Sequence, residues 1–131
     1  MEQQQIMQMQ MLQQEAEDLN QQLQLIEQNL SEIEKLKESL EEIDKNENKE
    51  ILANIGKKIF LPVEIKDKNL FVEIGKGNFV KKTIPETIQV TEEQTKKLVA
   101  GKQEVVERLE GLQKEVENMM QGFIKENQDK K

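Results

Sequence analysis

The sequence predicts an α+β fold, a long antiparallel two-helix coiled coil (a helical hairpin) with two β-hairpins at the helix junction. Two arms with heptad patterning flank a middle segment that repeats itself, and only 35% of the 131 residues are apolar. A packed globule of this size would contain roughly 45–50% apolar residues. A chain so poor in apolar residues is either disordered or built from elements that bury a narrow stripe, and the heptads favour the second alternative.

Composition divides the chain into three parts. Residues 1–50 carry 13 acidic and 4 basic side chains, residues 51–90 carry 4 and 7, and residues 91–131 carry 9 and 8. Three of the four Phe and both Pro fall in the middle part. We therefore expect an N-terminal coiled-coil helix over 1–50, a double β-hairpin oligomerisation head over 51–90 and a C-terminal coiled-coil helix over 91–131.

The first arm shows the alternating three- and four-residue spacing of a coiled coil. The spacing is unbroken over eight positions, which are Met9, Leu12, Ala16, Leu19, Leu23, Ile26, Leu30 and Ile33. The next apolar residue is Leu36, which skips one step of the repeat and predicts a stammer that overwinds the coil locally. Leu40 and Ile43 follow, and the helix is expected to end at Asn46. A seam this narrow requires a second helix against it.

The second arm repeats the pattern and supplies that helix. Its two rows are Thr95, Lys102, Leu109, Val116 and Phe123, and Leu98, Val105, Leu112 and Met119. Thr91 and Gln94 have the spacing of a capping box, which predicts the start of the helix. Each arm of about 40 residues would be roughly 60 Å long as a helix. Antiparallel arms of matching length bring both chain ends to one tip.

Three glycines interrupt the second arm, and each costs about 1 kcal/mol relative to Ala in a helix interior. They are Gly101, Gly111 and Gly122. Their presence in a helix has two alternative explanations, which are close packing against a neighbour and local flexing of the helix.

The middle part contains an internal repeat. Residues 51–65 and 70–84, offset by 19 positions, share an Ile-Gly-Lys turn, so each half is predicted to be a strand, a turn and a second strand. Pro62 lies within a strand and cannot donate to a ladder, which predicts a free edge there. Four short strands form a poor core of their own and leave open edges. We expect these hairpins to pair with those of other subunits in a shared sheet or barrel.

The candidate oligomerisation residues are apolar and lie in these two halves. They are Ile55, Phe60, Val63, Ile65, Phe71, Val72, Ile74, Phe79, Val80 and Ile84. Because strand residues alternate between two faces, only about half of them can face the shared core, and the sequence leaves open which half.

The sequence lacks most of the side chains that catalysis uses. It contains no His, Cys, Trp or Tyr, which excludes Cys/His zinc sites, thiol nucleophiles, His general bases and disulfides. Gly75-Lys76-Gly77 is followed by a strand and lacks the rest of a nucleotide-binding loop, so it is predicted to be a hairpin turn. We expect no catalytic residue, no metal and no cofactor, and therefore no enzyme.

Charge and hydropathy exclude further classes. A net charge of −7 argues against a nucleic-acid binder held by phosphate contacts. No run of about 18 apolar residues exists, so no membrane span is expected. The Gln-rich N-terminus lacks a basic and then apolar leader, so we expect no signal peptide and a cytoplasmic protein.

Methionine is concentrated at the two chain ends. All six are within the first 11 residues or at positions 119 and 120, and Glu2 is the one charged side chain among residues 1–14. Methionine suits surfaces that accept many shapes, because it is unbranched and polarizable. The candidate binding residues for exposed apolar segments of other proteins are Ile6, Met7, Met9, Met11, Leu12, Met119, Met120, Phe123 and Ile124. The alternative is that these side chains only close the end of the coil or belong to frayed ends.

The whole chain resembles an α-class prefoldin subunit of the archaeal type. The resemblance rests on the order helix, double hairpin, helix, on the segment ILANIGKKIFLPVEIKDKNLFVEIGKGNFVKKTIPETI at 51–88, and on NMMQ at 118–121. The double hairpin distinguishes the α class from the β class, which has one hairpin.

The resemblance implies a hexamer of two α and four prefoldin β subunits, in which the hairpins build an intersubunit β-barrel platform. The coiled coils would hold unfolded client proteins at their tips without ATP and pass them to a group II chaperonin. The alternative function is a coiled-coil architectural adaptor, whose arms bind one defined partner helix. An adaptor should have a single tight partner and little affinity for misfolded proteins.

Overall fold

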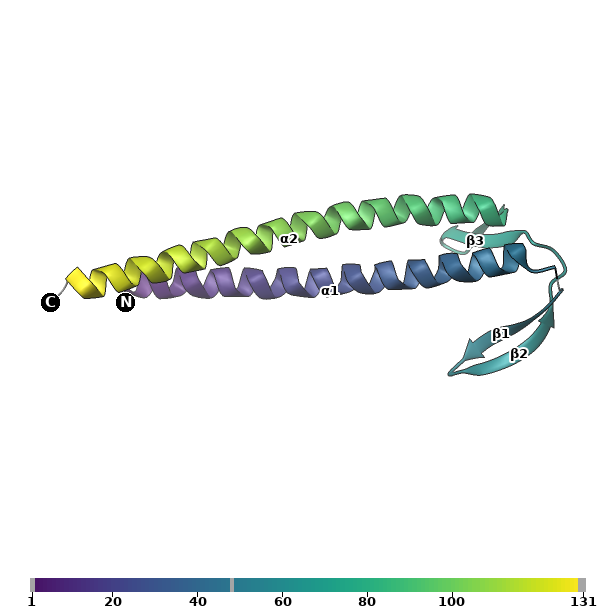
Figure 1. The fold of residues 1–131 in the computed structure, drawn as a ribbon, viewed down its shortest axis with the longest axis horizontal. Coiled ribbons are helices and arrows are strands. Elements are labelled where there is room, and N and C mark those ends of the chain that lie inside the picture. The colour runs from purple at the N-terminus through teal and green to yellow at the C-terminus, as the bar shows by residue number, and fades with distance from the viewer. Residues whose placement is uncertain (1, 48, 130–131) are drawn as a thin grey trace. The chain divides into compact units, whose positions relative to one another are not determined.

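The computed structural model describes residues 2–47 and 49–129, and it confirms two long helices with two β-hairpins between them (Figure 1). The elements in order are α1 (Gln3–Lys45), β1 (Glu50–Gly56), β2 (Ile59–Glu64), β3 (Leu70–Gly75), β4 (Asn78–Lys82) and α2 (Ile84–Asp129).

The chain forms two compact units. The first, here called the coil unit, combines the chain up to Ser31 with the chain from Lys96 onward. The second, the head unit, spans Glu32–Thr95 and contains both hairpins. The boundary falls within both long helices.

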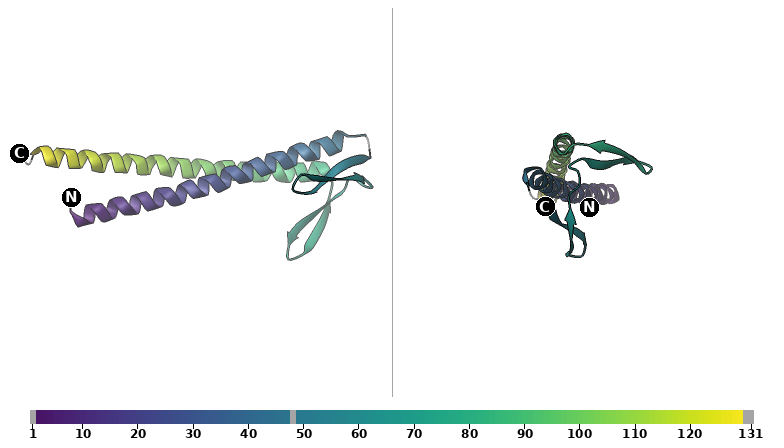
Figure 2. Two further views of the ribbon diagram at one scale, coloured as in Figure 1. Left: turned by 90° about the horizontal axis from the view of Figure 1, so that it is seen from below. Right: turned by 90° about the vertical axis from the view of Figure 1, so that its right-hand side faces the viewer.

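The two helices of the coil unit run antiparallel, as predicted. Arg108 Nε lies 2.9 Å from Glu15 Oε1, and Lys102 Nζ lies 3.6 Å from Glu27 Oε1. Residue numbers thus rise along α1 as they fall along α2. Figures 1 and 2 accordingly show the start of α1 and the end of α2 at the same end of this unit.

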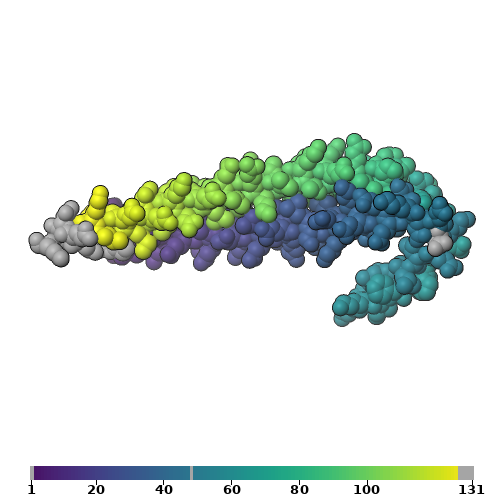
Figure 3. Space-filling view, viewed as in Figure 1, coloured from purple at the N-terminus to yellow at the C-terminus, as the bar shows by residue number. Residues whose placement is uncertain are grey.

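The seam of the coil unit follows the predicted rows. Leu112 is 2% exposed and Val105 is also buried, and the other predicted positions from Met9 to Leu30 and from Leu98 to Phe123 are half-buried. In Figure 3 the atoms of the two helices touch along the coil unit on the face shown. A narrow apolar stripe is therefore enough to join these helices.

The helix glycines have no packing role within this chain. A Cβ atom added at Gly101, Gly111 or Gly122 would meet no other atom within 4 Å. Close packing, one of the two alternatives from the sequence, is not what the described structure shows.

We therefore expect Gly111→Ala to stabilise the protein by about 1 kcal/mol, because Ala is the better helix former and fits without a clash. Urea denaturation followed by circular dichroism measures the shift in midpoint. Gly56→Ala is the contrasting control, since Gly56 has a φ of 130° that disfavours any side chain. Destabilisation by Gly111→Ala would show that this glycine packs against something that the chain alone does not contain.

The head-unit part of the coil corrects the predicted stammer. Leu36 is 48% exposed, whereas Lys37 is half-buried, and Leu40 is buried. The step from Ile33 to Lys37 to Leu40 keeps the regular spacing, so the irregularity does not lie at Leu36 as predicted. It comes one turn later, because Ile43 is half-buried three residues after Leu40 while Asp44 is exposed. The aliphatic part of a lysine can line an apolar seam while its ammonium group stays in water. Here Lys37 Nζ lies 3.3 Å from Glu92 Oε1.

Helix α2 begins at Ile84, so the helix start predicted at Thr91 was wrong. Thr83 Oγ1 accepts a hydrogen bond from Glu86 N at 3.2 Å and donates to Glu86 Oε1 at 3.0 Å. Thr83 thus caps the helix with Glu86 three residues on, and Pro85 fits the first turn because no backbone donor is needed there. Thr91 lies within the helix, 3% exposed, and its hydroxyl donates to Ile88 O at 2.6 Å.

Removing this cap should weaken the head unit. We expect Thr83→Ala to lower the free energy of unfolding by about 1 kcal/mol, because Glu86 N loses its acceptor. Thr83→Ser keeps a hydroxyl and should retain most of the stability in the same urea titration. Equal losses for the two variants would contradict the capping role.

The hairpins form two separate two-stranded antiparallel sheets, β1–β2 and β3–β4. Figure 2 shows them pointing in different directions. Both turns have two residues with positive φ, Lys57 and Lys58 in the first and Lys76 and Gly77 in the second. This is the type I′ geometry that matches the twist of paired strands. The hairpin turn predicted at Gly75-Lys76-Gly77 is confirmed, and Pro62 lies in β2 as predicted.

Each hairpin contains a β-bulge that the sequence analysis missed. The register slips between Asn54 and Gly56 and again between Glu73 and Gly75. Ile55 and Ile74, which are equivalent in the internal repeat, are the extra residues. A bulge places two residues opposite one, so simple alternation between faces fails at these positions.

Candidate functional site

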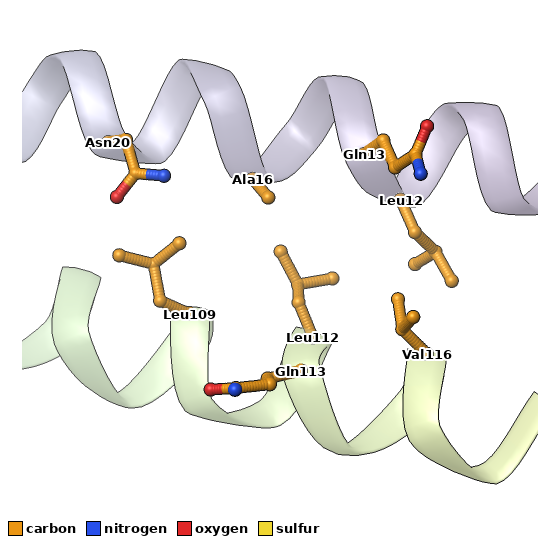
Figure 4. A pocket seen from close by; sticks show the side chains of 8 residues that line it. All are labelled: Leu12, Gln13, Ala16, Asn20, Leu109, Leu112, Gln113 and Val116. Atoms are coloured by element: carbon orange, nitrogen blue, oxygen red, sulfur yellow. The ribbon is translucent and has the colours of Figure 1, made fainter. Parts of the chain in front are cut away.

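Near the chain ends, the seam contains one methionine from each helix. Leu12 of α1 and Val116 of α2 line the same groove and point toward one another (Figure 4). Met9 lies three residues before Leu12, and Met119 lies three residues after Val116. The antiparallel arrangement therefore places these two methionines about level with each other, and both are half-buried.

Five other predicted tip residues lie outside the seam, on the surface. Met11 is 72% exposed, Met7 62%, Ile124 58%, Met120 54% and Ile6 39%. We call these five side chains the tip patch. Met9, Leu12, Met119 and Phe123 are half-buried. The nine candidate residues thus divide into those that contribute to the seam and those that remain available to another molecule. Met1 lies outside the described residues.

The tip patch has little charge around it. No residue from Gln3 to Gln14 is charged, and the nearest charged side chains of α2 are Glu117, Lys125 and Glu126. Such a surface can bind apolar groups without first removing water from ions. Long unbranched side chains also adapt to different shapes.

A groove of about 440 Å³ lies beside the tip. Eight residues line it, and they are Leu12, Gln13, Ala16, Asn20, Leu109, Leu112, Gln113 and Val116 (Figure 4). Ala16 occupies a seam position with a small side chain, which leaves space opposite Leu112. The groove is open to solvent and has amide groups at its rim.

Arg108, the one arginine of the sequence, links the two helices next to this groove. Its Nε and Nη2 donate to the two carboxylate oxygens of Glu15 at 2.9 and 3.2 Å. These hydrogen bonds raise the pKa of the Arg108 guanidinium. The two-point contact favours one register of α1 against α2, because a shift along the seam would break both bonds.

The hairpins carry most of the remaining exposed apolar surface. Among the predicted oligomerisation residues, Ile55, Phe60, Phe71, Ile74, Phe79 and Val80 are exposed, and Val63, Ile65 and Val72 are half-buried. Ile84 does not belong with them. It is the first residue of α2 rather than a strand residue, and it is 1% exposed within this chain. Its apolar surface is thus already buried in the head unit.

Three further apolar residues of the first hairpin are exposed but were not predicted, and they are Leu52, Ile59 and Leu61. The register pairs Leu52 with Pro62 and Ala53 with Leu61. Leu52 and Leu61 therefore point to opposite faces of the hairpin. The first hairpin exposes apolar side chains on both faces, which an alternating pattern with one apolar face would not predict.

Asp67 organises the loop between the hairpins. Asp67 Oδ1 accepts a hydrogen bond from Asn69 N at 3.1 Å, and Asp67 Oδ2 lies 3.4 Å from Lys81 Nζ. The bonds from Asn69, followed by the contact with Lys81, lower the pKa of the Asp67 carboxyl group. The part of the chain that the structure describes contains no group of three acidic side chains placed to hold a metal. None of its helices is long and apolar enough to cross a membrane.

Comparisons with known proteins agree with this architecture. A family model described as "Prefoldin subunit" matches residues 12–129. The solved structure described as filamentous PFD from Methanocaldococcus jannaschii, determined by cryo-EM, is similar with a TM-score of 0.73 and 12% sequence identity. The similarity covers 86% of this chain and 94% of that one. No curated protein sequence matches.

Proposed function

This chain belongs to the prefoldin family, and from that premise we propose that it is an α-class subunit of an ATP-independent holdase chaperone. Family membership implies a chaperone-related function and assembly with other prefoldin subunits. The finer proposal is that the tips of the coiled coils capture unfolded proteins in the cytoplasm and pass them to a group II chaperonin. The two hairpins between the helices support the α class.

The tip patch is the observation that carries this proposal. Its five side chains are exposed and apolar. Three of them belong to the start of α1 and two to the end of α2. Each apolar contact stabilises a complex by about 25 cal/mol per Å² removed from water, so a single tip binds weakly. Several tips held in one assembly raise the effective concentration of binding sites. A chaperonin that competes for the client can then release it without ATP.

The hairpins support assembly. Each is a two-stranded sheet with open edges, and isolated hairpins are marginally stable in water. We propose that they pair with hairpins of β subunits in an intersubunit β-barrel, within a hexamer of two α and four β subunits. Mass measurement of the purified chain, alone and mixed with a candidate β subunit, tests this. Because the similar solved structure is filamentous, the measurement should also distinguish a closed hexamer from an open filament.

Aggregation of a chemically denatured protein, diluted into buffer without ATP, tests the holdase function. The assembled full-length chain should suppress light scattering. The same assembly without the first 12 and last 12 residues should not, because the tip patch is removed. Unchanged suppression by the shortened chain would show that clients bind elsewhere. Binding of one native helical partner without suppression of aggregation would instead favour the architectural adaptor.

A further inference from the structure

We propose that oxidation of Met7, Met11 and Met120 by a peroxide switches the tip patch from apolar to polar while the coiled coil stays folded. This inference rests on the proposed function, because it concerns regulation of the same surface. Three of the five tip-patch residues are methionines, so their sulfur chemistry controls most of the patch.

The structure separates the methionines into two classes. Met7, Met11 and Met120 are 62%, 72% and 54% exposed, which leaves their side chains open to a small oxidant. Met9 and Met119 are half-buried in the seam. The sequence contains no cysteine, so methionine supplies all of its sulfur. Oxidation should therefore begin on the patch and reach the seam later.

The reaction is an oxygen transfer. A thioether sulfur attacks one peroxide oxygen, an S–O bond forms and the O–O bond breaks. The sulfur loses two electrons, and the second oxygen leaves as water with both hydrogen atoms when the oxidant is hydrogen peroxide. The product, methionine sulfoxide, is polar and chiral, and enzymes can reduce it back to methionine.

The consequence for binding follows from the apolar area that is lost. The sulfoxide oxygen accepts hydrogen bonds from water, and burying it against an apolar client would break them at a cost in free energy. Three of the five tip-patch side chains would then oppose client binding instead of favouring it. We expect client affinity to fall about fivefold or more at each tip. The helices should remain paired, because Leu112 and Val105 hold the seam and neither contains sulfur.

The experiment uses the full-length chain in its assembled form, treated with hydrogen peroxide and then freed of it by catalase. Peptide mapping by mass spectrometry locates the sulfoxides, circular dichroism reports helicity, and light scattering of a denatured client reports binding. We expect sulfoxide at Met7, Met11 and Met120 before Met9 and Met119, unchanged helicity, and weaker suppression of aggregation. Methionine sulfoxide reductase should restore the suppression.

The matched control is the variant M7L/M11L/M120L, which keeps apolar side chains of similar size without sulfur. Each protein is compared with its own untreated sample, and the variant should lose much less of its activity on peroxide treatment. Equal loss in the variant, earlier oxidation of the seam methionines, or a fall in helicity would overturn the switch. If the untreated protein suppresses aggregation and peroxide does not change that suppression, the switch is rejected while the proposed function stands. An untreated full-length assembly without any suppression rejects the proposed function itself.

Discussion

Replacing the tip patch by glutamine is expected to raise the amount of protein needed for half-suppression of client aggregation by about tenfold or more. The changes are Ile6→Gln, Met7→Gln, Met11→Gln, Met120→Gln and Ile124→Gln. Glutamine has a similar length and a good helix propensity, so the helices should form as before. The loss arises because five exposed apolar side chains no longer contribute buried area at the interface with a client.

A control of the same chemistry is available elsewhere in the coil unit. Leu25 and Val99 are 60% and 49% exposed, lie outside the seam and are not part of the tip patch. The variant with Leu25→Gln and Val99→Gln should suppress aggregation as well as the unchanged protein does. An equal loss in both variants would mean that general surface apolarity, and not the tip, captures clients.

Leu112→Ala is expected to lower the free energy of unfolding by roughly 3 kcal/mol, because removing a buried leucine side chain forfeits its transfer energy and leaves a cavity. Leu112 is 2% exposed and faces Ala16 across the seam (Figure 4). Ala16 is too small to fill the lost volume, and the groove already present there should widen. Urea denaturation of the assembled protein, followed at a helix-sensitive wavelength, measures the change.

Leu25→Ala makes the same chemical change on the surface, since Leu25 is 60% exposed. Substitutions of this kind usually alter stability by less than about 0.5 kcal/mol. The difference between the two variants isolates the contribution of the seam. Nearly equal midpoints for Leu112→Ala and Leu25→Ala would show that Leu112 is not a main contact between the helices.

Regular patterns made much of the fold predictable from the sequence. The heptad rows identify the seam of the coil unit, and a small set of turn residues identifies the hairpins. The same reasoning failed where a polar side chain took an apolar role. Lys37 continues the seam through its aliphatic stem, and a search for apolar residues alone selected Leu36 instead.

Two further features, the start of α2 and the β-bulges, were not predicted correctly. Thr91 and Thr83 both precede a residue that can complete a capping box, and Pro85 in the first turn favours the earlier start. Repetition of the Ile-Gly-Lys sequence indicated a turn but not the bulge before it. The bulge depends on how two strands pair, which neither strand reveals alone.

The candidate site was predictable in part. Heptad positions separate Met9 and Met119 from Met7, Met11 and Met120, and the exposure of these side chains agrees with that separation. For the hairpins, the sequence suggested apolar residues but not their accessibility. Ile84 was assigned to a strand, whereas it is the first residue of α2 and its side chain is buried within this chain.

The two-sided apolar character of the first hairpin has a consequence for the solubility of the chain on its own. A copy without partners displays Leu52 on one face and Leu61 on the other, and exposed apolar surface of this kind makes a chain prone to aggregate. The isolated chain should therefore lose solubility as its concentration rises.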